Sequence, residues 1–255
     1  MRYARLLVDG TPRHGLVRDD VLVLLDGDPI AGTAREIGRA IPLAEANFLV
    51  PCVPTKIVGV GLNYRAHALE MGKPLPAEPL LFFKPLSALT PSGAAIVRPG
   101  GYLRVDFEGE LCAVIGRRCR RATVENALSH VFGYTILNDV TVRDLQKRDI
   151  QYARAKGFDS FAPVGPFIAT DVDPARARIR SHLNGRLCQD AATDDLIFSV
   201  AQLVSFVSHV MTLEPGDLLT TGTPPGVGNL APNDTISIAI DGIGTLTNPV
   251  SGDIA

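Results

Sequence analysis

The apolar residues of the chain form many short runs that are divided by Gly, Pro and Asp. Runs of this kind cover residues 80–83, 103–116, 133–137, 166–170, 217–221 and 235–240. Short apolar runs between turn-forming residues are typical of β-strands. The helical period is rarer and is found mainly at 64–71, 124–130 and 200–211. Because strands outnumber helices and do not alternate with them regularly, we predict an α+β fold around a mixed or antiparallel sheet.

One predicted helix has both a start signal and an apolar stripe. Ser199 and Gln202 stand in the spacing of a capping box. Helical spacing then places these residues on one side: Val200, Leu203, Val204, Val207, Val210 and Met211. We therefore assign this helix to the core.

The first 50 residues differ from the rest of the chain. Apolar runs at 4–8 and 21–25 are separated by turn signals such as Asp9-Gly10, which predicts a small antiparallel hairpin module. Pro51 then precedes a buried strand predicted at 56–61. We place a boundary near residue 50, between an N-terminal β module (1–50) and a main domain (51–255).

Charge and hydropathy narrow the classes of function. The chain has 25 basic and 27 acidic residues, and a balance so near zero argues against a nucleic-acid or membrane-surface partner. The most apolar long stretch, 196–211, contains too many polar residues to cross a bilayer. The N-terminal residues lack the apolar region of a secretory signal. We expect a cytoplasmic protein.

Cysteine and histidine spacing excludes the usual zinc motifs. The four cysteines are scattered without a C-x-x-C pair, and the five histidines include no H-E-x-x-H. We expect reduced, structural thiols. Any bound metal must therefore be held mainly by carboxylates.

Closely spaced carboxylates occur in the run 103–110, where Asp106, Glu108 and Glu110 fall on one face of a predicted strand. Along a strand, Glu108 and Glu110 are about 6.6 Å apart and repel one another. A cation between them relieves the repulsion, and so does an exposed, solvated edge. Because the apolar run 111–116 follows at once, an acidic rim here suits a hard divalent ion, although an E-x-E pair by itself is more often part of a solvated edge strand.

A third carboxylate, Asp139, follows the strand predicted at 133–137. Two Glu and one Asp, completed by waters, would form an oxygen octahedron suited to Mg²⁺ or Mn²⁺, with Ca²⁺ as a further candidate. Taken alone, Asp139 fits a turn or a helix N-cap equally well. The sequence therefore predicts a metal site only if the three carboxylates meet.

A possible proton-transfer pair lies in the helix predicted at 64–71, where His67 and Glu70 are neighbours on one turn. A Glu beside a His orients the ring and increases its basicity, so the pair could take a proton from water. Without further context, such a pair is more often an ordinary surface pair. The Pro- and Gly-rich stretch 72–79 could be a mobile cover over a site. Farther along the chain, Lys156 lies among small residues, which could hold it near a site or leave it solvated.

Nucleotide-binding motifs fail on inspection. Gly59 and Gly61 are followed by Tyr64 where a dinucleotide fingerprint needs its third glycine, and 222–228 lacks the Gly-Lys-Ser/Thr end of a P-loop. The basic run 117–121 is short and directly follows a predicted strand, so we interpret it as an exposed turn.

Taken together, these residues resemble the fumarylacetoacetate hydrolase family from about residue 56 to residue 250. The matching motifs, in chain order, are Gly59-Val-Gly-Leu-Asn-Tyr64, His67-x-x-Glu70, Phe82-Phe83-Lys84-Pro85, Phe107-Glu108-Gly-Glu110-Leu111, Asn138-Asp139-Val-Thr-x-Arg143-Asp144-x-Gln146, Ala155-Lys156-Gly-Phe158-Asp159, and Leu213-Glu-Pro-Gly-Asp217 with Gly222-Thr223-Pro224-x-Gly226-Val-Gly228. Each piece is weak alone, but their number and order are specific.

The resemblance implies roles for particular residues. Glu108, Glu110 and Asp139 would bind the metal; His67 and Glu70 would form the dyad of a lid; Lys156 would stabilise charge; Gln146 and Thr223 would line the substrate pocket. It also implies a mixed β-sandwich roll, usually paired as a homodimer, and the first 50 residues resemble the small N-terminal module of bacterial members.

The resemblance leaves the reaction open among related chemistries. Many acylpyruvate-cleaving members have Arg where this chain has Leu62, whereas the ending at 246–250 is similar to bacterial 2-hydroxyhepta-2,4-diene-1,7-dioate isomerases of aromatic catabolism. The favoured expectation is metal-dependent C–C hydrolysis of a small 2-oxo or 2-hydroxy-dienoate diacid of the fumarylacetoacetate or acylpyruvate type. One alternative is a 2-hydroxyhepta-2,4-diene-1,7-dioate isomerase or decarboxylase, and another is an oxaloacetate decarboxylase. A third alternative is a non-catalytic protein that binds metal as a scaffold.

Overall fold

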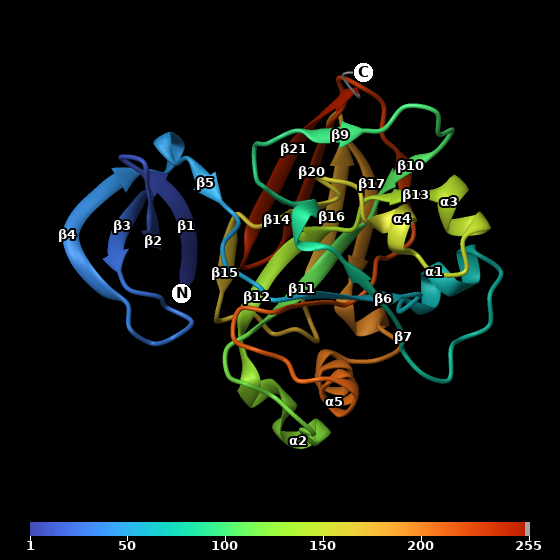
Figure 1. Cartoon of the computed structure of the whole chain (residues 1–255), viewed down its shortest axis with the longest axis horizontal. Helices are drawn as coiled ribbons and strands as arrows, with labels where there is room; N and C mark the ends of the chain where they lie inside the picture. Colours follow the sequence, from blue (N-terminus) through green and yellow to red (C-terminus); the bar gives the residue numbers. More distant parts are fainter. Residues whose placement is uncertain (253–255) are drawn as a thin grey trace.

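The structure of the chain is a computed structural model that describes residues 1–252 (Figure 1). Most of its strands belong to one 13-stranded mixed sheet with the principal order β4-β3-β2-β1-β15-β12-β11-β18-β6-β7. Its strands are β1 (Arg2–Val8), β2 (Thr11–Arg18), β3 (Val21–Asp26), β4 (Arg35–Pro42), β5 (Phe48–Leu49), β6 (Ile57–Gly61), β7 (Leu80–Lys84), β8 (Leu89–Pro91), β11 (Gly109–Ile115), β12 (Val131–Asn138), β14 (Ala162–Val164), β15 (Phe167–Ala169) and β18 (Leu218–Thr220).

Two smaller sheets complete the strand framework. The five-stranded sheet contains β17 (Arg186–Ala192), β16 (Arg178–Leu183), β20 (Thr235–Ile240), β21 (Gly244–Gly252) and β9 (Ile96–Arg98), in that order. The three-stranded sheet contains β13 (Thr141–Val142), β10 (Val105–Phe107) and β19 (Gly228–Asn229). Strands β16 and β20 pack against β11 and β12, so the five-stranded sheet covers the middle of the large one.

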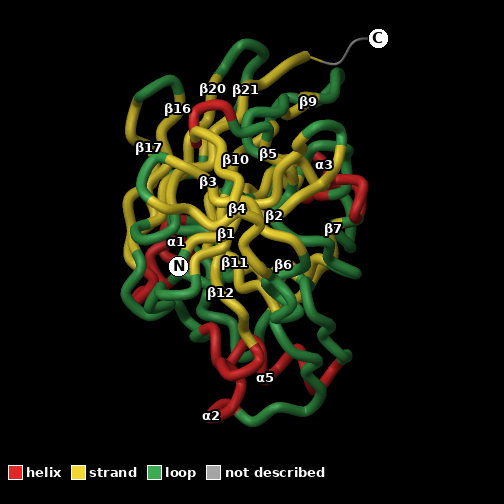
Figure 2. Tube along the Cα trace, turned by 90° about the vertical axis from the view of Figure 1, so that its left-hand side faces the viewer, coloured by secondary structure: helices red, strands yellow, loops and turns green. Residues whose placement is uncertain are grey.

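The helices are short. They are α1 (Arg65–Glu70), α2 (Val124–Ala127), α3 (Arg143–Arg148), α4 (Ala153–Lys156), α5 (Val200–Val210) and the 3₁₀ turns η1 (Leu43–Glu45), η2 (Leu86–Ala88), η3 (Leu128–His130) and η4 (Thr193–Asp195). Figure 2 shows α2 and α5 together at one end of the molecule, beyond the strands. The predicted α+β class with a mixed sheet is confirmed. Among residues 1–252, no helix is both long and apolar enough to traverse a bilayer.

The main core combines buried residues of β6, β11, β12, β18, β20 and α5. The capping box predicted for α5 is present. Ser199 Oγ accepts from the Gln202 backbone N–H, and the Gln202 side-chain oxygen accepts from the Ser199 backbone N–H. Its stripe is buried from Val200 to Val207, as expected for a core helix, but Val210 is exposed. That position lies in the last turn, where the helix leaves the protein interior.

The four N-terminal strands form an antiparallel ribbon at one side of the molecule (Figures 1 and 2). A separate hydrophobic cluster, which includes Ala4, Leu6, Leu22, Leu24 and Phe167, holds them together. Because β1 also pairs with β15, the ribbon continues the large sheet. The division into 1–50 and 51–255 stays a prediction.

Two local features differ from the expectations drawn from the sequence. The run 103–116 is not one strand, because it breaks at Glu108 between β10 and β11, which belong to different sheets. The hairpin of β16 and β17 was not predicted, although Asn184 and Gly185 both have positive φ at its turn. An Asn-Gly pair between strands is a strong hairpin signal. The break at Glu108 places that carboxylate at a junction between sheets.

Candidate metal centre and active site

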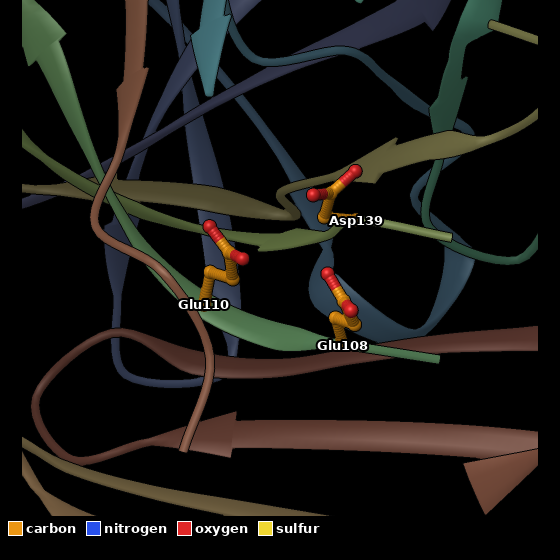
Figure 3. A group of neighbouring side chains, drawn as sticks. All are labelled: Glu108, Glu110 and Asp139. Atoms are coloured by element: carbon orange, nitrogen blue, oxygen red, sulfur yellow. The ribbon is translucent and has the colours of Figure 1, made fainter. Parts of the chain in front are cut away.

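Three carboxylates meet where β10, β11 and β12 come together. Glu108, Glu110 and Asp139 each offer an oxygen, and these oxygens all lie within 4.8 Å of one another. All three residues are buried. Figure 3 shows the side chains of Glu108 and Glu110 rising from one segment toward the neighbouring segment that carries Asp139. The structure therefore brings together the residues that the sequence predicts as metal ligands.

Strand pairing explains this meeting. Strands β11 and β12 are antiparallel, with Glu110 opposite Leu137 and Gly109 opposite Asn138. Immediately beyond the paired region, the Asp139 backbone N–H donates to the Glu108 carbonyl oxygen at 2.9 Å. The register thus places the end of one strand against the start of the other, although the two segments are distant in the sequence.

Two buried lysines neutralise part of the cluster. Lys156 Nζ donates to Glu108 Oε2 at 3.0 Å, to Thr141 Oγ1 at 2.9 Å and also to Asp139 Oδ2. Lys84 Nζ donates to the other Asp139 oxygen at 2.6 Å. Both ammonium groups are almost fully buried, so their charges act in a poorly screened environment.

Arg143 links the cluster to Asp106. Its Nε donates to Asp106 Oδ2 at 2.8 Å, and its Nη2 lies 2.5 Å from Glu108 Oε1. The other Asp106 oxygen accepts from Arg104 Nε at 2.8 Å. Arg143 Nη1 also holds the Gln146 side-chain oxygen at 2.8 Å. Asp106 is therefore paired with two arginines and stands apart from the cluster that includes Glu108.

The two glutamates have opposite pKa shifts. Burial acts to raise the pKa of Glu108, but the charges of Arg143 and Lys156 outweigh it and hold that pKa below its usual range. For Glu110, burial raises the pKa, and the negative charges of Asp139 and Glu108 raise it further. Glu110 is thus the member of the cluster that lacks enough positive charge.

The lysines differ for a related reason. Burial lowers the pKa of Lys84 by more than the single carboxylate of Asp139 raises it. Burial also acts to lower the pKa of Lys156, but Asp139 and Glu108 together outweigh it, and the pKa is raised. Lys156 therefore carries its charge more firmly than Lys84.

The donor set fits a hard divalent cation. An octahedral site with bonds of about 2.0–2.1 Å places its ligand oxygens roughly 3–4 Å apart. One oxygen from each residue of the cluster lies within 4.8 Å of the other two, so a small contraction around a bound ion would bring the three to that spacing. The carboxylate of Glu110 accepts from the Gly222 N–H at 3.0 Å and has no ion-pair partner in residues 1–252. A cation bound by all three carboxylates would supply the charge that Glu110 lacks.

The His67 and Glu70 pair lies on α1. His67 Nδ1 and Glu70 Oε2 are 2.8 Å apart, and the His67 side chain is largely buried. The second Glu70 oxygen accepts from the Gly226 N–H at 3.3 Å. A ring held at Nδ1 by a carboxylate can present Nε2 as a proton acceptor.

These groups share a cavity of about 650 Å³, within the usual range for small-molecule sites. Its wall includes the predicted site residues His67, Glu70, Glu108, Glu110, Gln146, Lys156 and Thr223. Asp139 joins them through the carboxylate cluster. The structure thus places all eight predicted residues around one site, and their individual roles stay predictions.

Other residues of the site received no role from the sequence. Lys84 and Arg143 fall within the motifs of the resemblance, yet their contacts with Asp139 and Glu108 depend on folding. A lysine at the end of the apolar run 80–83 was an available signal for Lys84, because lysine is rarely fully buried without a partner. Arg143 carried no such signal.

A match to the model of a known protein family shows which family the chain belongs to. The model described as fumarylacetoacetate (FAA) hydrolase C-terminal matches residues 56–251. The chain belongs to the fumarylacetoacetate hydrolase family. A second model, described as Rv2993c-like, N-terminal, matches residues 1–51 of this family member.

Other members of the fumarylacetoacetate hydrolase family cover nearly the whole chain. The 2,4-didehydro-3-deoxy-L-rhamnonate hydrolase of Sphingomonas sp. (strain SKA58) is 43% identical and covers 98% of this chain and 96% of its own length. The crystal structure of 2-hydroxyhepta-2,4-diene-1,7-dioate isomerase from Mycobacterium marinum is 42% identical, with a TM-score of 0.93 and full coverage of both chains. That of maleylpyruvate hydrolase from Sphingobium sp. SYK-6, in complex with manganese(II) and pyruvate, is 32% identical, with a TM-score of 0.82 and 99% coverage of both.

Proposed function

We propose that this chain is a divalent-metal-dependent hydrolase that cleaves a C–C bond of a small 2-oxo or 2-hydroxy-dienoate diacid. The observation that carries the proposal is the buried carboxylate cluster of Glu108, Glu110 and Asp139 on the same cavity as the His67–Glu70 pair. Mg²⁺ or Mn²⁺ held by those carboxylates would supply Lewis-acid stabilisation for the 2-oxo oxygen and its neighbouring carboxylate. The manganese and pyruvate in the related maleylpyruvate hydrolase support this assignment.

The His67–Glu70 pair would provide the base. With Nδ1–H donated to Glu70, the Nε2 lone pair of His67 takes a proton from water. The resulting hydroxide attacks the carbonyl carbon remote from the 2-oxo acid. The C–C bond then breaks, its electron pair passes to the 2-oxo acid fragment as an enolate, and a proton returns to that fragment. One water is consumed, and two carboxylic acids are released.

Lys156 and Arg143 would hold the negative charge of the enolate. Both carry positive charge at the edge of the carboxylate cluster and line the cavity. They are already oriented by Glu108 and Asp139, so little reorganisation is needed when charge develops. Gln146 is oriented through its bond to Arg143, and its amide nitrogen, which has no hydrogen-bond partner within residues 1–252, would face the substrate.

The second carboxylate of the diacid has candidate partners at the mouth of the cavity. Lys73, Arg104 and Lys147 line the cavity with exposed side chains. Arg104 is oriented by its bond to Asp106. Leu62 lines the same cavity, at the position where many acylpyruvate-cleaving members have an arginine. Lys73, Arg104 and Lys147 would supply the positive charge here instead.

A second candidate is isomerisation of 2-hydroxyhepta-2,4-diene-1,7-dioate. The observation in its favour is the similarity to the Mycobacterium marinum isomerase over the full chain. The same His67–Glu70 pair would then move a proton between carbons, and no water would attack. Decarboxylation, including that of oxaloacetate, would use the same stabilised anion. A metal-binding scaffold needs no base, and the buried His67 facing the cavity argues against it.

A substrate panel tests the function. Fumarylpyruvate, acetylpyruvate, oxaloacetate and the heptadienedioate are incubated with the protein and Mg²⁺, Mn²⁺ or EDTA, and ultraviolet loss is followed by product analysis. We expect the highest kcat/KM for fumarylpyruvate, with fumarate and pyruvate as products, and no turnover in EDTA. His67→Ala should reduce turnover while leaving Mn²⁺ affinity near the wild-type value. Turnover that survives both EDTA and His67→Ala contradicts the proposal.

The cationic mouth is tested by the charge of the substrate. We expect Arg104→Gln with Lys147→Gln to raise KM for fumarylpyruvate about 10-fold, since exposed charge pairs contribute about 1 kcal/mol or less each. Acetylpyruvate has one carboxylate, so its KM should change little. Arg117→Gln, an exposed arginine away from the cavity, is the control. Equal changes for both substrates would assign the mouth residues no role in recognising the second carboxylate.

The assembly and location of the chain also stay proposals. We propose a homodimer, supported by a group of exposed apolar side chains, Leu80, Phe83 and Ile150, near β7 at the end of the large sheet. A cytoplasmic location stays a prediction.

A further inference from the structure

Helix α1, which carries His67 and Glu70, has little stability of its own. It has only six residues, whereas isolated helices shorter than about 12–15 residues are marginal in water. The residue before it is Tyr64, whose side chain makes no capping hydrogen bond. The position of the helix must therefore come from contacts with other parts of the chain.

At the N-terminal end of α1, the hydrogen bonds to distant residues come from one segment, residues 193–198. Asp195 Oδ2 accepts from the Ala66 backbone N–H at 2.9 Å, and the Leu196 carbonyl oxygen accepts from Arg65 Nη1 at 2.6 Å. Asp195 thus takes the place of the missing N-cap side chain and puts a carboxylate at the positive end of the helix. Asp195 and Ala66 are 129 positions apart in the sequence.

The same segment also holds the chain just before α1. Asn63 is fully buried, and its backbone oxygen accepts from Ile197 N–H at 2.8 Å. Its side chain bonds to Phe198 N–H at 2.8 Å, to the Phe198 carbonyl oxygen at 3.0 Å and to the Thr221 carbonyl oxygen at 2.8 Å. The next residue, Gly222, donates to Glu110. Asn63 therefore ties segment 193–198 to the stretch of chain that adjoins the carboxylate cluster.

The other end of α1 has a weaker attachment. Glu70 Oε1 accepts from Gly226 N–H at 3.3 Å, and the Glu70 side chain is about half exposed. Beyond it, residues 71–79 form neither helix nor strand and are mostly exposed. The geometry of His67 thus depends mainly on the attachment at the N-terminal end of α1.

We propose that Asp195 is a positioning residue for the proton-transfer pair. Its carboxylate caps α1 and fixes the helix against segment 193–198, so that His67 and Glu70 stay on the wall of the cavity. This inference rests on the proposed function, because it assumes that the pair transfers a proton. Asp195 does not line the cavity and acts only through α1.

Three variants separate the role of the hydrogen bond from that of charge or folding. Asp195→Ala removes the acceptor, and Asp195→Asn keeps an acceptor without the charge. Asp194→Asn is the matched control, because Asp194 is the exposed neighbour and has no side-chain hydrogen bond within residues 1–252. We expect Asp195→Ala to lower kcat about 10-fold, as the loss of a helix cap displaces the helix. Asp195→Asn should retain kcat within about threefold of wild type, and Asp194→Asn should be unchanged.

Two further measurements do not depend on turnover. Backbone hydrogen exchange in a peptide covering 64–73 should become faster in Asp195→Ala than in Asp194→Asn. Mn²⁺ affinity, measured by calorimetry, should be equal in all variants, because the carboxylate cluster is untouched. If KM for the diacid stays within about twofold while kcat falls, the variant has lost alignment of the pair rather than substrate binding.

The outcomes that overturn the proposal are specific. Exchange in 64–73 that is unchanged by Asp195→Ala overturns it, and so does an Asp195→Asn enzyme as impaired as Asp195→Ala. Loss of Mn²⁺ affinity in parallel with kcat would show general unfolding instead of misplacement of α1. Absence of metal-dependent turnover in the wild type overturns the proposed function. In that case, the difference in hydrogen exchange between Asp195→Ala and Asp194→Asn still shows whether Asp195 fixes α1.

Discussion

At the scale of the residue, identical side chains acquire different chemistry from their partners. Glu108 and Glu110 are both buried, but Glu108 contacts Arg143 and Lys156, whereas Glu110 accepts its hydrogen bond from a backbone N–H. Opposite pKa shifts follow from that difference. Glu110 is thus the carboxylate whose charge is most costly without a cation and most useful with one.

Replacing Glu110 by Gln should separate metal binding from folding. Gln keeps the shape and an acceptor for Gly222 N–H but removes the charge. We expect Mn²⁺ affinity to fall about 100-fold or more, and the melting temperature of the metal-free protein to stay equal or rise, since an unpaired buried charge has been removed. Calorimetry and thermal melts with and without Mn²⁺ check both. Exposed Glu45→Gln is the control, and an unchanged metal-induced shift in the Glu110 variant would contradict the assignment.

At the scale of the element, a few polar side chains hold distant strands in register. Strands β6 and β18 pair in parallel near the cavity, and Asp217 lies directly before β18. Asp217 Oδ1 accepts from Thr55 N–H at 2.9 Å and from Lys56 N–H at 3.1 Å, and Oδ2 accepts from Glu214 N–H at 2.7 Å and forms an ion pair with Lys56. One buried carboxylate therefore orders the starts of both strands.

Asp217 should make stability depend on acid pH. Burial acts to raise its pKa, but hydrogen bonds from Glu214, Lys56 and Thr55 outweigh it and lower the pKa. A lowered folded-state pKa contributes stability above the unfolded value of about 3.9 that is lost as pH falls through the folded-state pKa. We expect Asp217→Ala to lower the free energy of unfolding by about 3 kcal/mol at pH 7, because several buried donors lose their acceptor.

Urea unfolding at pH 7 and between pH 4 and pH 2 checks this dependence, with Asp194→Ala as the exposed control. The difference between wild type and Asp217→Ala should shrink as the pH falls below about 4. A difference that is constant down to the lowest pH would assign the stabilisation to packing rather than to the carboxylate.

At the scale of the whole molecule, the large sheet ends at β7 with an apolar surface beside the cavity. Leu80 is 47% exposed, Phe83 is 53% exposed and Ile150 is fully exposed. Leu80 also lines the cavity, so whatever covers this surface lies next to the entrance of the site. A second copy of the chain is the occupant we propose, since exposed apolar groups of this kind favour association.

Light scattering after size-exclusion chromatography should give about twice the 27.2 kDa of the single chain. Ile150→Asp should shift the equilibrium toward the monomer, because it places a charge in the apolar contact. Leu103→Asp is the matched control, as Leu103 is 87% exposed but is not part of that apolar group. A wild-type mass near that of one chain contradicts the homodimer, and a dimer that is indifferent to Ile150→Asp places the contact elsewhere.

Local chemistry was enough to predict much of the chain. The apolar runs predicted most strands of the core, the Ser199–Gln202 spacing predicted the start of α5, and the Glu108 and Glu110 pair pointed to a cation. Each of these depends on neighbouring residues, so it is written in a short stretch of sequence. The break at Glu108 escaped prediction because β10 and β11 pair with different sheets.

Folding alone decided which of these residues meet. The tertiary fold brings Lys84 of β7 and Lys156 of α4 to different oxygens of Asp139, and it places Asp195 of η4 at the start of a helix 129 positions away. Hydrophobic burial sets that fold, and the hydrogen bonds and charges follow from it. The types of side chain needed for a metal site were therefore present locally, while their charges and alignment came from contacts between segments that are distant in the sequence.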